Sequence, residues 1–438
     1  MATRLMDRIP RLLQQVAFRR FWTAQTISYL GDQVSTIALP LTAVLALNAS
    51  AAEMGFLGAL ASLPNLLFAL HIGGFVDRYG HLRRTMVWCD LGRAAVLITV
   101  PIAYALDALT LSHLLVVAFA TGTLAMFFNV SSNSMFAAVV KREDYVQGLS
   151  LTRGSFSFSW VAGPGLGGML VQALSAPVAL VADTLSFLGS AFLLKTVDVA
   201  EPKPQKERSG SGIRDGLRFV NRTPVLRAKF IGGGLLNLFY TMYFTLFLLF
   251  IARELKLTPG MIGAALGLGA VGALLGSFVT GRVTRRIGIG PTFLLGSLLF
   301  PGALALVPFA NDNKWVAFGL VVAAELVSGM GLMLCDIAGS SIQQALTPDR
   351  FRSRVQGAYL GLINGVRTVG ALVAGGLGTL IGLRPALWFA VIGGVLSCLP
   401  LLLAPVLRMR ELPEQAEPTE PAEEPERAEV PEQAKRAE

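Results

Sequence analysis

The chain has 438 residues, of which 53% are hydrophobic and only 15% are charged, and its mean hydropathy is +0.59. Soluble domains carry about 25% charged residues on average, so this chain cannot form a water-soluble surface of ordinary polarity. The composition excludes soluble enzymes, nucleic-acid-binding modules and disordered scaffolds. It predicts a polytopic membrane protein.

Twelve apolar stretches are long enough to cross about 30 Å of hydrocarbon. They lie at about 20–46, 53–76, 85–106, 111–138, 148–172, 177–195, 228–252, 258–280, 291–310, 315–346, 357–381 and 384–407. The predicted organisation is a cytoplasmic N-terminal segment (1–19), a six-helix bundle (20–195), a polar and mobile cytoplasmic central loop (196–227), a second six-helix bundle (228–407) and a disordered cytoplasmic tail (408–438).

The placement of basic residues predicts the orientation. With the N-terminus inside, 30 of the 37 Lys and Arg residues lie in inner segments and four lie in outer loops. This bias is the positive-inside pattern, so we expect both termini on the cytoplasmic side of the cell membrane. The net charge of +9 then faces anionic lipid headgroups, and we expect no nucleic-acid partner.

The two halves contain matching segments. Gly74–Gly80 follows the second stretch and Gly281–Gly288 follows the eighth, 207 residues later. Val146–Gly148 opens the fifth stretch and Val355–Gly357 opens the eleventh, 209 residues later. Two matches at nearly one offset predict two six-helix halves in the same orientation, with a substrate site between them near the midplane.

At these segments the chain resembles the major facilitator superfamily. Gly73–Arg84 (GGFVDRYGHLRR) resembles the signature of its loop 2–3, and Arg153–Gly168 (RGSFSFSWVAGPGLGG) resembles the antiporter motif of its fifth helices. Together with Asp90–Arg93 (DLGR), they are similar to the branch that holds macrolide and enterobactin exporters and other proton-coupled drug effluxers. The resemblance implies an all-α major facilitator fold with two pseudo-symmetric halves, and we expect a monomer.

The resemblance implies a gate that closes the inner side in the outward-open state. Its residues are Gly74, Asp77, Arg78, Gly80, Arg83 and Arg84. The alternative interpretation is a tight turn with positive-inside arginines. Thr284 replaces the acid in the second copy, so the gate is expected to be asymmetric.

The resemblance also implies an antiporter-type seal toward the outer side. Its residues are Arg153, Gly163, Pro164, Gly167 and Gly168. Ser150 and Ser159 stand where the fuller motif usually has glycines. A generic proline kink that lets a neighbouring helix approach is the alternative.

Two acids lie deep in the predicted spans. Asp32 is about 18 Å into the first and Glu325 about 15 Å into the tenth, at 1.5 Å per residue. An ionisable group in lipid is costly unless it faces a cavity or a partner. Burial favours the neutral carboxyl and a nearby cation favours the charged one. We therefore predict Asp32 as the main proton and substrate carboxylate and Glu325 as the second, against the alternative of interhelical hydrogen bonding.

Further polar residues fall inside the spans. Candidates for a substrate cavity are Asn129, Asn133, Asn237, Tyr240 and Tyr243, although hydrogen bonding between helices explains them equally well. The remaining buried charges, interpreted as structural or gating groups, are Asp90, Arg93, Asp183, Asp336 and Arg367.

Motifs of enzymes are absent from the sequence. It contains no G-x-x-x-x-G-K-[ST], H-E-x-x-H or G-x-S-x-G pattern, and its three cysteines lie far apart in apolar stretches. We expect no enzymatic activity, no metal and no cofactor, with the proton gradient as the energy source. The leading hypothesis is proton-coupled efflux of a small amphipathic compound such as an antibiotic, natural product or siderophore.

Three other hypotheses remain open. Lysophospholipid flippases of the same superfamily are also similar, because their first helices can carry a Gly-Asp step like Gly31-Asp32. Uptake is another, although the antiporter-like Gly163-Pro164 element argues against it. A non-transporting membrane receptor or scaffold is the last. It does not explain Asp32 and Glu325, because an acid near the midplane is costly and a scaffold does not need one.

Overall fold

A computed structural model describes residues 11–199, 212–311 and 313–411, with the backbone alone at 69–79, 212–214, 350, 353 and 408. The first half contains α2 (Arg11–Gln14), α3 (Val16–Leu45), α4 (Ala51–Tyr79), α5 (Leu82–Leu97), α6 (Thr99–Ala105), α7 (Leu111–Val139), η1 (Arg142–Asp144), α8 (Tyr145–Leu174) and α9 (Ala176–Lys195). The second contains α10 (Gly212–Arg222), α11 (Pro224–Arg253), α12 (Pro259–Ile287), α13 (Ile289–Ala303), η2 (Leu304–Leu306), α14 (Lys314–Leu346), α15 (Asp349–Leu380), α16 (Leu383–Leu396), α17 (Leu399–Leu403) and η3 (Pro405–Arg408).

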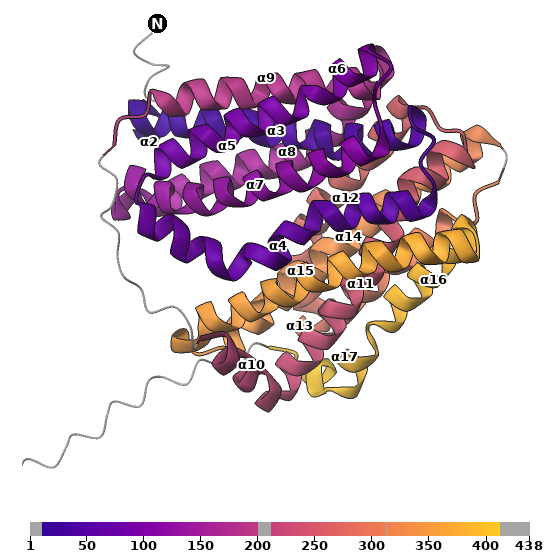
Figure 1. The fold of residues 1–438 in the computed structure, drawn as a ribbon. Coiled ribbons are helices and arrows are strands. Elements are labelled where there is room, and N and C mark those ends of the chain that lie inside the picture. Colours follow the sequence, from indigo (N-terminus) through magenta and orange to yellow (C-terminus); the bar gives the residue numbers. More distant parts are fainter. Residues whose placement is uncertain (1–10, 200–211, 312, 412–438) are drawn as a thin grey trace, which may run out of the picture.

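The predicted twelve-helix fold is confirmed. Ten helical segments among the described residues are long and apolar enough to cross a membrane. The other two spans are α3 and α8, each 30 residues long, whose apolar runs are interrupted by polar side chains. In Figure 1 the helices from indigo to magenta form one layer, and those from rose to yellow form the other.

The two halves meet along two helix pairs, α4 with α15 and α8 with α12. In the predicted repeat, α4 corresponds to α12 and α8 to α15. The pairing is therefore reciprocal, as a two-fold relation between halves requires.

Glycines bring both helix pairs into close contact at one end of the bundle, where α4 and α12 begin and α8 and α15 end. A Cβ added at Gly55 of α4 would lie 2.7 Å from Cα of Gly375 of α15. A Cβ added at Gly168 of α8 would lie 2.5 Å from Cα of Gly263 of α12. Only glycine permits these backbone approaches. We call this end the closed end.

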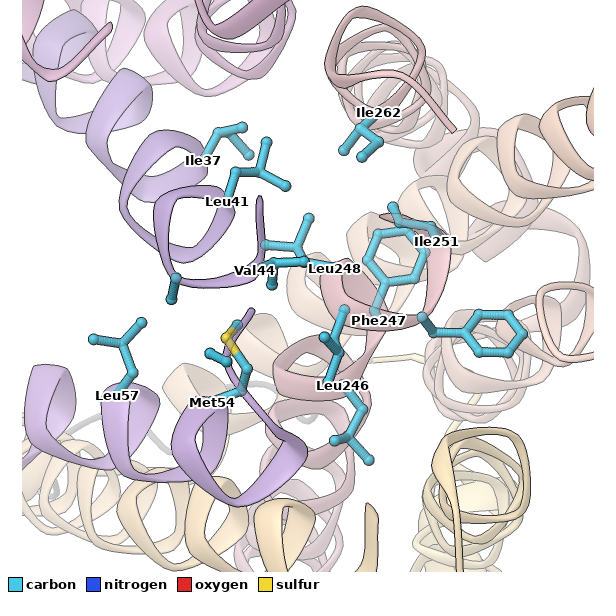
Figure 2. Close-up of a cluster of buried hydrophobic side chains, with 14 of the residues drawn as sticks. Ile37, Leu41, Val44, Met54, Leu57, Leu246, Phe247, Leu248, Ile251 and Ile262 are labelled. Atoms are coloured by element: carbon cyan, nitrogen blue, oxygen red, sulfur yellow. The ribbon is translucent and has the colours of Figure 1, made fainter. Parts of the chain in front are cut away.

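Apolar side chains from both halves fill the closed end between these contacts (Figure 2). The labelled members of this apolar plug are Ile37, Leu41, Val44, Met54, Leu57, Leu246, Phe247, Leu248, Ile251 and Ile262. They come from α3 and α4 on one side and from α11 and α12 on the other. At this end, one continuous core therefore joins the halves.

At the opposite end, the described apolar core is divided between the halves. One cluster there, which includes Phe18, Met86 and Leu194, contains first-half residues alone. Two further clusters, around Phe293 and Phe230, contain second-half residues alone. The halves thus pack together at the closed end and separate toward what we call the open end.

The central loop differs from its prediction. Residues 212–222 form the helix α10, which packs on α15. Phe219 stacks on Phe351 with ring centroids 4.9 Å apart, and Val220 is buried. The amphipathic pattern within this polar segment explains the helix, because it brings Phe219 and Val220 against α15. Residues 200–211 and 412–438, which include most of the predicted disordered tail, lie outside the described residues.

A substitution at the closed end should weaken its closure. A valine at Gly375 would press on Gly55 and on the carbonyl oxygen of Ala51, 3.1 Å from an added Cβ. Overpacking of this kind costs about 1–3 kcal/mol, and this cost falls on the closed arrangement. We expect Gly375→Val to raise the labelling rate of a cysteine placed in the plug, such as Leu41→Cys, roughly tenfold.

The neighbouring glycine supplies a matched control. An added Cβ at Gly376 meets nothing within 4 Å, so Gly376→Val should leave the labelling rate of the same reporter unchanged. Equal labelling in the two valine variants would contradict a seal made by the glycine contact.

Candidate functional site

A cavity of about 340 Å³ lies between the two halves. The first half contributes Gln33, Thr36, Ile37, Trp160 and Pro164, and the second contributes Tyr240, Thr241, Phe244, Leu266, Gly269, Ala270, Ala273, Phe300, Glu325, Ser328, Gly329, Leu332 and Arg367. Aromatic and aliphatic side chains dominate this central cavity, with a few polar groups among them. Such a lining suits a small compound with a large apolar surface.

Glu325 is the one carboxylate in the lining of the central cavity. It lies on α14, and within the described residues it makes no hydrogen bond or ion pair. A carboxylate at this depth is costly when charged and unpaired. Binding a proton or a cationic ligand removes that cost, so Glu325 can respond to either.

A buried charge cluster occupies the first half. Arg93 of α5 forms ion pairs with Asp32 of α3 and, at 3.3 Å, with Asp90 one turn earlier on its own helix. Asp183 of α9 accepts hydrogen bonds from Ser35 and, at 2.9 Å, from Ser186. Asp90, Arg93 and Asp183 are at most 3% exposed. We call the four charged residues the acid cluster.

Helix packing accounts for this gathering of charges. Gly31 precedes Asp32 and lies against Ser186 and Asp183, so that α3 and α9 approach closely. The guanidinium of Arg93 lies 3.9 Å from the ring centroid of Phe187, which covers its apolar face. Three carboxylates therefore surround one guanidinium in a low-dielectric region. Full ionisation leaves two negative charges uncompensated, and each bound proton removes one.

The acid cluster opens into a second cavity of about 260 Å³, which we call the side cavity. Asp32, Arg93 and Asp183 line it, and the side chain of Asp32 is 40% exposed. Thr36, one turn after Asp32, lines both the side cavity and the central cavity. The predicted carboxylate thus faces a cavity next to the central one, while its charge is paired.

The predicted gate is placed only in part. Gly74, Asp77 and Arg78 lie in the part of α4 whose side chains are outside the described residues. Gly80 has a φ of 63°, the left-handed turn that favours glycine. Arg83 donates a hydrogen bond to the carbonyl oxygen of Val197 at 2.6 Å, and Arg84 is exposed. The gating role stays a prediction.

The residues of the antiporter motif divide between two contacts. Gly163 packs on the side chain of Gln33, and a Cβ at Gly167 would lie 3.3 Å from Cα of Val34, so both seat α8 on α3. Gly168 contacts α12 at the closed end, and Pro164 lines the central cavity. Arg153 is exposed.

The predicted cavity residues separate into two groups. Tyr240 lines the central cavity, and Asn237 accepts a 3.3 Å hydrogen bond from Arg367, which also lines it. Tyr243 is 2% exposed and stacks on Phe247 in the core. Asn129 and Asn133 of α7 are exposed and line neither the central nor the side cavity.

Sequence reasoning missed several residues of the site. Trp160 is 47% exposed within the span and lines the central cavity, and Gln33 reaches it from the first helix. Ser35 joins the acid cluster. Trp160 lies within the antiporter-like segment, and Gln33 and Ser35 closely follow Asp32. Residues three apart on a helix share a face, so the spacing from Asp32 to Ser35 indicates that Ser35 lies beside the acid.

These features define a membrane transporter: two six-helix halves enclose a cavity that is sealed at one end. The family model described as "Major Facilitator Superfamily" matches residues 21–367 and 230–436. The chain belongs to this superfamily, and it is a multi-pass integral membrane protein.

Relatives and solved structures agree with this assignment. The multidrug efflux pump Tap of Mycolicibacterium fortuitum is 26% identical over 410 residues, which cover 89% of this chain and 95% of that protein. The class C tetracycline resistance protein of Escherichia coli is 26% identical over 365 residues, covering 80% and 87%. The fold is similar to a bacterial homologue of the iron transporter ferroportin in its inward-facing state, with a TM-score of 0.69, 17% identity and coverage of 88% and 98%.

Proposed function

We propose that this transporter exports a small amphipathic compound in exchange for protons by alternating access. The observation that carries the proposal is the position of Glu325, a carboxylate that forms no ion pair among the described residues and lies in a largely apolar cavity between the halves. A cationic amphipathic compound would pair with the ionised carboxylate and bury its apolar surface against Tyr240, Phe244 and Phe300.

The acid cluster supplies a second proton-binding group for the same cycle. Its carboxylates outnumber its guanidinium three to one, so that protons and the charge of Arg93 compete for them. Asp32 is the member with solvent access through the side cavity. In the proposed cycle, Asp32 takes a proton on one side of the membrane, loosens its pairing with Arg93, and frees α3 to move.

The distribution of basic residues supports an orientation with the open end at the cytoplasm and the closed end outside. The structure then corresponds to a state that accepts its substrate from inside the cell. Two relatives, a multidrug efflux pump and a tetracycline resistance protein, support export over uptake.

Asp32→Asn tests the proton-coupled step. The amide keeps the shape of the side chain but cannot bind and release a proton, so we expect proton-driven export to fall about tenfold or more. The measurement is uptake of a fluorescent cationic dye, such as rhodamine 123, by everted vesicles under an imposed pH gradient.

The control for Asp32→Asn is Asp349→Asn, which removes an exposed carboxylate from the first turn of α15. This variant should transport at the wild-type rate. Unchanged proton-driven transport in Asp32→Asn itself would remove Asp32 from the mechanism.

A further inference from the structure

A third cavity, of about 270 Å³, is lined by the second half and by Trp160 of the first, and it contains a buried lysine. Lys229 of α11 is 6% exposed. Its Nζ donates a hydrogen bond to Oε1 of Gln343 at 2.5 Å and lies 5.1 Å from the ring centroid of Tyr359. Nε2 of Gln343 in turn donates to Oε1 of Gln356 at 3.0 Å. Among the described residues, the ammonium therefore makes its hydrogen bond and ring contact with neutral groups, and it forms no ion pair with a carboxylate.

The charges that line this cavity favour an anionic ligand. Arg367 is the second cation in the lining, and its guanidinium is oriented by a 3.3 Å hydrogen bond to Oδ1 of Asn237. Asp336 is the opposing carboxylate, and within the described residues it forms no ion pair with Lys229 or Arg367. Two cations face one anion, so the cavity holds an excess of positive charge. We call it the basic cavity.

The basic cavity adjoins the central cavity. Trp160, Tyr240, Phe300, Leu332 and Arg367 line both. Glu325 and Asp336 lie eleven residues apart on α14, which is about three helical turns, so both acids and Leu332 face the same way. At 1.5 Å per residue, the carboxylate of the central cavity and the acid of the basic cavity are about 16 Å apart along the helix axis.

We propose that the basic cavity binds the anionic group, a carboxylate or a phosphate ester, of an amphipathic substrate whose cationic end pairs with Glu325. The two cavities then form one elongated site, with Glu325 toward one end, Lys229 toward the other, and Arg367 and aromatic rings in the lining that they share. A zwitterionic amphipath satisfies both ends at once, whereas a simple cation leaves Lys229 unpaired in a low-dielectric region. The inference rests on the proposed function, because it concerns the substrate of the same pathway.

A purely structural role for Lys229 fits the geometry less well. A lysine that serves only to join helices is expected to meet a carboxylate or to extend its ammonium to water. Here the ammonium lines a cavity large enough for a ligand group, and Gln343 and Gln356 fix its position without neutralising it. This arrangement orients a charge toward a space that a ligand can fill.

Equilibrium binding to the full-length protein in nanodiscs tests the proposal. The probes are rhodamine 110, which carries a free carboxylate, and rhodamine 123, its methyl ester, with fluorescence anisotropy as the measurement. Lysophosphatidylcholine is the lipid arm, measured by its displacement of rhodamine 110. We expect rhodamine 110 to bind the wild-type protein at least about tenfold more tightly than its ester, because the carboxylate adds one charged hydrogen bond.

Lys229→Gln should abolish that preference by weakening rhodamine 110 and leaving rhodamine 123 within about twofold. The matched control Lys314→Gln removes an exposed cation from the start of α14 and should preserve it. Tight displacement by lysophosphatidylcholine that also depends on Lys229 assigns the site to a lipid phosphate, and its absence assigns it to carboxylate compounds.

Two outcomes would overturn the proposal: no preference for rhodamine 110 in the wild-type protein, or a preference for rhodamine 110 that Lys229→Gln leaves unchanged. A variant that merely misfolds would lose rhodamine 123 as well, so the ester reports on folding. Binding at equilibrium uses no pH gradient. Failure of proton-driven export would therefore contradict the proposed function without affecting this result.

Discussion

Glu325→Gln is expected to reduce gradient-driven export of a cationic amphipathic dye by roughly 10- to 100-fold. The substitution keeps the size of the side chain in the central cavity but removes its charge. A charged hydrogen bond contributes about 1.5–3 kcal/mol, and each 1.4 kcal/mol corresponds to a factor of ten in affinity. The variant also loses the group for which proton and substrate compete. Dye accumulation in proteoliposomes with an imposed pH gradient measures both losses together.

Glu143→Gln is the matched control for Glu325→Gln, because it makes the same change at an exposed position of η1. It should transport as the wild-type protein does. If Glu325→Gln accumulates dye at the control's rate, the central carboxylate has no part in coupling, and the proposed exchange of protons for substrate loses its main support.

Arg93→Met is expected to lower the free energy of unfolding by about 3–5 kcal/mol, the usual result of removing one partner from a buried ion pair. The reason is electrostatic, because the substitution leaves Asp32, Asp90 and Asp183 without a cation at a site where Asp90 and Asp183 are at most 1% exposed. The loss should be larger at high pH than at low pH, since protons can neutralise the carboxylates that Arg93 no longer pairs. Thermal unfolding of the detergent-solubilised protein over a range of pH values provides the measurement.

Arg19→Met makes the same chemical change at an exposed position of α3 and should leave stability within about 0.5 kcal/mol of the wild-type value. Combining Arg93→Met with Asp90→Asn should recover part of the loss, because one uncompensated charge disappears. A pH-independent loss that the second substitution does not relieve would indicate that Arg93 acts by packing on Phe187 and not through its charge.

Much of the fold follows from patterns that a sequence displays openly. The lengths of the apolar stretches predict the membrane spans. The matching segments around Gly74 and Gly281 indicate the repeat, because corresponding helices in the two halves bury corresponding faces. The helix α10 escaped prediction, since its stability depends on Phe219 meeting Phe351, a contact that only the folded chain creates. The polar composition of residues 196–227 favours a loop, although residues 212–222 also carry an amphipathic pattern.

The candidate site was less accessible to sequence reasoning. The depths of Asp32 and Glu325 in their predicted spans indicate two separate buried acids. Depth along one helix does not show which side chains of other helices lie beside an acid. Asp183 was interpreted as a structural or gating charge, yet it joins Asp32 and Arg93 from a helix about 150 residues away. Lys229 lies at the start of the predicted seventh span (228–252), where the positive-inside pattern alone accounts for a basic residue. Its burial is set by Gln343 and Tyr359, which come from other helices.

The divided core at the open end has a consequence for assembly. Each half contains apolar clusters of its own there, so neither depends on the other to bury those side chains. Severing the chain between residues 199 and 212 would cut through none of these clusters. Two separately translated polypeptides therefore ought to find one another in the bilayer and rebuild the transporter, held together chiefly by the interlocking glycines and the apolar plug.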